Sequence, residues 1–118
     1  MPTARGSAGA RAEAMAAEFL AHRGLAIVER NFRRRCGELD LIARDGDTLV
    51  FVEVRLRTRR DFGGAAESIT TAKRARMIAA AGHYLAGIAR PPPCRFDAIL
   101  LDALDPSRID WRRNVVET

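Results

Sequence analysis

The chain has 118 residues, which fits a single domain with one modest core and leaves too little sequence for a second domain. Its 20 Lys and Arg residues against 15 Asp and Glu residues give a formal net charge of +5, which favours a polyanionic partner such as nucleic acid or an anionic membrane surface. The 2 cysteines match neither a disulfide framework nor a zinc pattern, and neither a membrane span nor a signal peptide is evident, so we expect a cytoplasmic protein.

The first half of the chain predicts a helix followed by strands. The helix is expected over residues 8–23, with Ser7 as its N-cap and Gly24 at its end. Strands are then expected over residues 25–30, 38–43 and 48–56. A two-residue turn centred on Asp45 and Gly46 joins the last two strands. Because all the links are short, these strands should form an antiparallel meander.

The second half predicts a crossover helix and a final strand. The helix is expected over residues 71–86 with Thr70 as its cap, and the prolines at residues 91–93 prevent its continuation. Its predicted apolar stripe consists of Ala75, Ile78, Ala81 and Leu85. Residues 94–102 form a strand apolar enough for burial on both faces, and the segment with Ile109 and Trp111 suggests a short edge strand.

This order of elements predicts an α/β fold with an αβββαβ core and a mixed sheet. A strand, a crossover helix and a second strand favour a parallel pair, so the final strand should lie parallel to the third. We expect one domain over residues 1–118, with mobile ends at residues 1–7 and about 113–118.

Three acidic residues, Glu38, Asp40 and Glu53, interrupt the apolar pattern of the predicted hairpin. A turn centred on Asp45 and Gly46 sets Glu38 opposite Glu53 and places Asp40 diagonally across from Glu53, all on one face. The opposite face is wholly apolar and consists of Leu39, Leu41, Val50, Val52 and Val54.

Two carboxylates in a partly buried place repel each other unless a cation compensates them. A divalent metal does so well, since carboxylate, water and phosphate oxygens form the usual Mg²⁺ shell. A second interpretation stays open, in which Glu38, Glu53 and Arg55 form a cross-strand salt-bridge lattice on a solvated face.

The run GELDLIARDGDTLVFVEVR at residues 37–55 resembles the YraN-like family, as do RFDAILLD downstream and GARAEAMAAEFL upstream. The likeness covers about residues 9–102. This largely uncharacterised family has the restriction-endonuclease-like fold and is related in outline to archaeal Holliday junction resolvases. The resemblance implies an active site with an aspartate, then Glu-x-Lys on the next strand, often with a glutamate from the first helix.

Carried onto this sequence, the resemblance makes Asp40 and Glu53 catalytic residues and ligands of Mg²⁺ or Mn²⁺, with the Val54 carbonyl as an additional donor. Glu13 is similar to the helix glutamate and is a further metal-ligand candidate, although it also reads as an exposed acid paired with Arg11. Glu38 is expected to orient other groups rather than to bind metal.

The sequence departs from the family pattern at Arg55, where lysine is expected. Arginine can stabilise charge on a phosphate oxygen, but a guanidinium cannot act as a base. Either Arg55 is a tolerated catalytic residue in a chain where 19 of the 20 cations are arginine, or strong catalysis has been lost and binding retained. A third hypothesis is that Lys73, the sole lysine, reaches the site instead.

Clusters of cations border the predicted site. The nucleic-acid-binding candidates are Arg33, Arg34, Arg35, Arg57, Lys73 and Arg76. A solvated arginine face without a partner is the alternative. The sequence thus predicts a metal-dependent nuclease acting on DNA, including branched DNA, or, as the second hypothesis, a non-catalytic nucleic-acid-binding module. Related resolvases act as dimers, so self-association is expected as well.

Overall fold

The computed structural model describes residues 6–57 and 70–116. Its elements, in chain order, are α1 (Gly6–His22), β1 (Ala26–Arg34), β2 (Gly37–Asp45), β3 (Thr48–Arg57), α2 (Thr71–Ala86), β4 (Cys94–Asp102), the 3-10 helix η2 (Pro106–Arg108) and β5 (Ile109–Arg112). Within the described residues, no helix has the length and apolar character that crossing a membrane requires.

The strands form one mixed sheet in the order β1-β2-β3-β4-β5. Neighbouring strands are antiparallel except for β3 and β4, which pair in parallel from Leu49 with Cys94 to Arg57 with Asp102. Both the predicted αβββαβ order and the parallel final pair are therefore confirmed. The predicted edge strand is also present, as β5.

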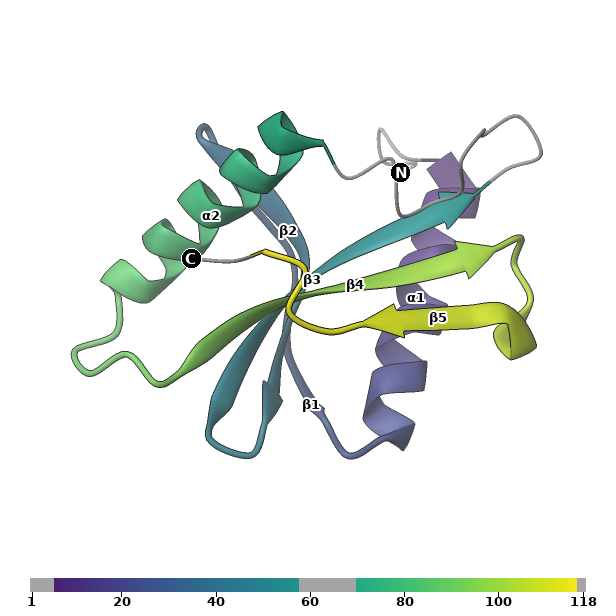
Figure 1. The fold of residues 1–118 in the computed structure, drawn as a ribbon, viewed down its shortest axis with the longest axis horizontal. Helices are drawn as coiled ribbons and strands as arrows, with labels where there is room; N and C mark the ends of the chain where they lie inside the picture. Colours follow the sequence, from purple (N-terminus) through teal and green to yellow (C-terminus); the bar gives the residue numbers. More distant parts are fainter. Residues whose placement is uncertain (1–5, 58–69, 117–118) are drawn as a thin grey trace.

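The two helices cover opposite faces of the sheet (Figure 1). Helix α1 packs Ala12, Ala16 and Leu20 on one face, because these residues recur at helical spacing. Helix α2 packs Met77, Ala80, Ala81 and Tyr84 on the other face. Two apolar clusters, one on each side of the sheet, thus hold the central strands β2, β3 and β4.

Several predicted details differ from the structure, and β1 extends to Arg34, beyond its predicted end at residue 30. Helix α1 begins at Gly6, so Ser7 lies inside it and the predicted Ser7 cap is wrong. The predicted stripe of α2 is also wrong in part, since Ile78 is 42% exposed while Met77 is buried. Apolar residues occur on more than one face of α2, so their spacing alone did not decide which face packs on the sheet.

The β2–β3 turn is shifted from the predicted position by one residue. Asp45 pairs with Thr48, so the central turn residues are Gly46 and Asp47. Gly46 has a φ of +60°, the sign that a type II′ turn requires at its first central position, and glycine adopts it without a steric penalty. The shifted turn moves the register by two residues, so that Phe51 pairs with Ile42.

The described part of the segment after β5 packs on the sheet. It turns back across β4 towards α2 (Figure 1), where the Val115 N–H donates to the Phe96 carbonyl at 2.7 Å. Val116 is buried in the α2-side cluster. The mobility expected at both ends of the chain stays a prediction. Residues 1–5 and 117–118 lie outside the described residues.

Asp97 anchors this segment from within β4. Its carboxylate is fully buried and accepts hydrogen bonds from Arg95 Nε at 3.1 Å, Trp111 Nε1 at 2.9 Å and the Asn114 N–H at 2.9 Å. Arg95 also lies 3.0 Å from Asp45. One buried carboxylate therefore joins β4, β5, the C-terminal segment and, through Arg95, the β2–β3 turn.

Gly37, the first residue of β2, sets the distance between β2 and α2. A Cβ atom built on Gly37 would overlap the backbone carbonyl of Arg76 in α2. Only glycine lets the helix backbone approach the strand this closely. The place of α2 over the sheet thus depends on a residue without a side chain.

We expect Gly37→Ala to lower the free energy of unfolding by about 1–3 kcal/mol, because the added methyl group forces α2 away from β2. Gly82→Ala serves as the control, because Gly82 is an exposed position of α2 with open space around it. This variant should raise the free energy of unfolding by about 0.5–1 kcal/mol. Urea denaturation of both variants measures the difference, and equal effects would contradict the close approach at Gly37.

Asp97→Ala should lower the free energy of unfolding by about 3 kcal/mol, because it removes the acceptor of a partly buried indole N–H, a backbone N–H and a guanidinium. The control is Asp110→Ala, whose ion pair with Arg112 is 53% exposed on both sides and should contribute less than about 1 kcal/mol. Thermal and chemical denaturation would measure both. If Asp97→Ala lowered the free energy of unfolding by less than Asp110→Ala does, the role of Asp97 would be refuted.

Candidate active site

The candidate site lies where β2 and β3 part. Their ladder ends with the pair Leu41 and Val52, and the next hydrogen-bonded pair of a regular hairpin would join Leu39 with Val54. Instead, the Val54 N–H donates to Asp40 Oδ2 at 2.8 Å. We call this point the fork. The Asp40 carboxylate lies in the fork, 1% exposed, and takes the acceptor place of a strand carbonyl.

The side-chain alternation of β2 breaks at Asp40. Leu41 packs in the α1-side cluster, whereas Leu39, two residues away, packs with Phe32 and Met77 on the α2 side. Asn31, which lies across from Asp40 in β1, has a φ of 54°, so both strands depart from regular geometry at this level. The prediction that Leu39 shares a face with Leu41 is therefore wrong.

Glu53, the residue after Val52 in β3, is buried beside Asp40 and contacts a lysine. Its side chain is 4% exposed, and its Oε2 lies 2.8 Å from Nζ of Lys73. Burial rules out the alternative of a solvated salt-bridge lattice that includes Glu53. The register shift by two explains why Glu53 is close to Asp40. Asp40 precedes Leu41 and Glu53 follows Val52, so both acids lie next to the last pair of the ladder.

The electrostatics of the pair are unfavourable for two negative charges. Burial, the hydrogen bond with Asp40 and the charge of Asp40 raise the pKa of Glu53 to about 8, against the lowering influence of the Lys73 ammonium. The ordinary value is 4.5. At neutral pH the Glu53 carboxyl group therefore tends to retain its proton, and an added cation would favour its release.

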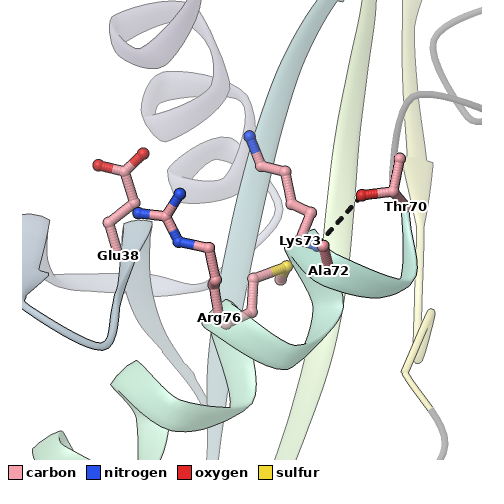
Figure 2. A pocket seen from close by; sticks show the side chains of 6 residues that line it. Glu38, Thr70, Ala72, Lys73 and Arg76 are labelled. Carbon is pink, nitrogen blue, oxygen red and sulfur yellow. Dashed lines mark hydrogen bonds between the residues drawn. The ribbon is translucent and has the colours of Figure 1, made fainter.

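Lys73 lines a pocket of about 220 Å³ together with Glu38, Thr70, Ala72, Arg76 and Met77, which we call the Lys73 pocket. Figure 2 shows Glu38 on one side of it and the residues of the α2 N-terminus on the other. The Thr70 hydroxyl accepts from the Lys73 N–H at 3.1 Å, so the predicted Thr70 cap is confirmed. The cap fixes the helical turn that carries Lys73.

Asp40 and Glu53 offer hard oxygen donors suited to Mg²⁺ or Mn²⁺, and their mutual repulsion is what a divalent cation would relieve. Among residues 6–57 and 70–116, no three His, Cys, Asp or Glu side chains converge closely enough to bind a metal ion together. Glu13 is 5% exposed, so its interpretation as an exposed acid is wrong, and its role as a third ligand stays a prediction.

Glu38 and Arg55 are the other two charged residues predicted for the hairpin site. Arg55 is half-buried in β3, two residues after Glu53 and so on the same face. Glu38 pairs with Arg33 across β1 and β2, and its Oε2 lies 3.5 Å from Arg33 Nε. The predicted pairing of Glu38 with Glu53 is thus wrong because of the register shift.

The predicted nucleic-acid-binding residues come from the β1–β2 turn region, the end of β3 and the start of α2. Arg33 and Arg34 end β1, and Arg35 follows in the turn, all three exposed. This end of the β1–β2 hairpin and the end of β3 lie on either side of the start of α2 (Figure 1). Arg76 is exposed beside the Lys73 pocket. Arg57 closes β3, and its side chain lies outside the described residues.

The sequence interpretation missed Gly37 as part of the site. Gly37 opens the GELDL run, and a glycine that begins a strand is a signal of close backbone approach. Its contact with the backbone of Arg76 sets the position of α2, and Lys73 lies one turn earlier on that helix. Asp97 was also missed as a network centre, although an acid inside an apolar strand indicates a buried partner.

The αβββαβ order with a parallel β3–β4 pair is consistent with a restriction-endonuclease-like core. The family model described as uncharacterised protein family UPF0102 matches residues 12–101, and the chain belongs to this family, as the YraN-like resemblance predicts. A UPF0102 protein of Nitrosospira multiformis is 51% identical over 109 residues, covering 92% of each chain. One from Cupriavidus metallidurans is 54% identical over 110 residues, covering 92% of this chain and 80% of the relative.

The raised pKa of Glu53 predicts a pH dependence of stability in the absence of divalent cations. Between about 4.5 and 8 the folded state holds a proton that the unfolded state has released, so the free energy of unfolding should fall as pH rises through this window and level off above it. Urea denaturation in EDTA measures this slope. In Glu53→Gln the contribution should vanish, and an unchanged slope in that variant would contradict the assignment.

Proposed function

We propose that this protein is a metal-dependent nuclease that hydrolyses phosphodiester bonds of DNA, including branched or otherwise structured DNA. The observation that carries the proposal is the burial of Asp40 and Glu53 side by side at the fork, with Nζ of Lys73 2.8 Å from Glu53. Two adjacent buried carboxylates are costly to the fold, and such a cost is typical of functional sites.

Asp40 and Glu53 would hold Mg²⁺ or Mn²⁺, and the Val54 carbonyl is a candidate for a further donor. Bound there, the cation would act as a Lewis acid on the phosphodiester and lower the pKa of a water molecule. The Val54 N–H fixes Asp40 Oδ2, so this carboxylate needs little reorganisation to bind a cation.

The cations around the fork would neutralise the DNA backbone. Lys73 and Arg76 line one pocket, and Arg55 lies on the Glu53 face of β3. Arg33, Arg34 and Arg35 extend the basic surface along the β1–β2 end. Contacts of this kind position phosphates without reading the base sequence. The proposal places the protein in the cytoplasm, where free Cys36 and Cys94 would stay reduced.

The second candidate function is a nucleic-acid-binding module without catalysis. One observation favours it: Lys73 already compensates Glu53, so the fold has a counter-ion for this acid without a metal. Arg55 at the position of the expected lysine points the same way. The two candidates differ in whether the carboxylates are needed for cleavage, and both predict salt-sensitive binding to DNA.

We expect Asp40→Asn and Glu53→Gln each to reduce cleavage of linear or branched DNA roughly 100-fold or more with Mg²⁺ or Mn²⁺, because each removes a charged metal ligand. Asp110→Asn is the control, since Asp110 lies in β5, is 53% exposed and pairs with Arg112, and it should stay within about threefold of wild type. A gel assay with labelled substrates measures all three.

Two outcomes would contradict the nuclease. Cleavage that survives both Asp40→Asn and Glu53→Gln would show that another enzyme in the preparation cuts the DNA. Salt-sensitive binding by the wild type without cleavage under either metal would leave the binding module as the function.

A further inference from the structure

Lysine has a chemical role at such a site that arginine fills poorly. An ammonium group is a compact charge on a flexible stem with three donors, so it can move between a carboxylate and a phosphate oxygen. A guanidinium is a planar fork that fits fewer arrangements. With Arg55 at the expected position, β3 supplies no lysine, and the chain contains a single one, Lys73.

Lys73 comes to the site from a different element. Its Nζ lies 2.8 Å from Glu53 Oε2, while its side chain is 28% exposed and faces the Lys73 pocket. The ammonium therefore contacts the buried carboxylate at one end of a space that a phosphate group can enter from solvent. Figure 2 shows the Lys73 side chain extending from the first turn of α2 beside this space.

Two features of the fold hold Lys73 in this place. The Thr70 hydroxyl caps the turn through the Lys73 N–H, and Gly37 allows the backbone of α2 to lie against β2 at Arg76. Since residues three apart share a helix face, Lys73 and Arg76 both line the pocket. The sequence places Lys73 twenty residues after Glu53, and only the packing of α2 brings the two together.

We propose that Lys73 is the lysine of this site: its ammonium holds the Glu53 carboxylate in place and contacts a phosphate oxygen of DNA bound at the fork. This inference rests on the proposed function and names the residue that allows position 55 to be arginine. Lys73 thereby couples α2 to the carboxylate pair, and the site is built from β2, β3 and α2 together.

The test compares Lys73→Met with Lys73→Arg and with Arg74→Met, which removes an exposed charge from the neighbouring position of α2 outside the pocket. The first readout is binding of a short duplex in EDTA at several salt concentrations. Loss of one phosphate contact should lower the slope of log Kd against log salt by about 1 in Lys73→Met. Lys73→Arg should keep the slope, and Arg74→Met should change it less than Lys73→Met.

The second readout is single-turnover cleavage with Mn²⁺. Lys73→Met should cut at least about 100-fold more slowly, and Lys73→Arg should lie between it and the wild type, because charge is kept but the compact ammonium is lost. Arg74→Met should remain within about threefold of wild type. A merely structural ion pair would change the free energy of unfolding without changing the salt slope, so urea denaturation of each variant separates the two roles.

Equal salt slopes for Lys73→Met and wild type would overturn the inference, as would cleavage by Lys73→Met at the wild-type rate. If the wild type binds DNA but does not cut it, the proposed nuclease fails, and the salt slope alone decides whether Lys73 contacts phosphate. If the wild type does not bind DNA, both proposals fail.

Discussion

The contact between Lys73 and Glu53 depends on the close approach of two backbones. Gly37 leaves no side chain between β2 and α2, so the helix lies against the strand at Arg76. One turn earlier, the capped start of α2 carries Lys73 to within 2.8 Å of Glu53. Burial of the Asp40 and Glu53 carboxyl groups is offset by this ammonium, and the pocket beside them is lined by the same helix.

The topology of the sheet explains why this cluster forms at the fork. Strand β3 stays paired with β4 from Leu49 to Arg57, whereas its ladder with β2 stops at Leu41 and Val52. The freed N–H of Val54 is satisfied by the Asp40 carboxylate. The parallel β3–β4 pair also requires a crossover, and α2 is that crossover.

Much of the fold followed from local pattern. Helix α2 and strand β4 begin and end where their cap, prolines and apolar runs predict, and a crossover helix implies the parallel pair. The register of the β2–β3 hairpin did not follow, because Asp45-Gly46 and Gly46-Asp47 are both reasonable turns and differ by two residues in pairing. That shift separates Glu38 from Glu53 and brings Asp40 beside Glu53.

The sequence by itself determined the αβββαβ order, the family resemblance and the candidates Asp40 and Glu53, because these depend on periodicity and on a contiguous motif. Tertiary structure alone decided which acids meet, that Leu39 leaves the face of Leu41, and that Lys73 of α2 forms an ion pair with Glu53. The reason is physical: strand register and helix docking are set by packing between segments far apart in sequence, and no local pattern encodes the distance between them.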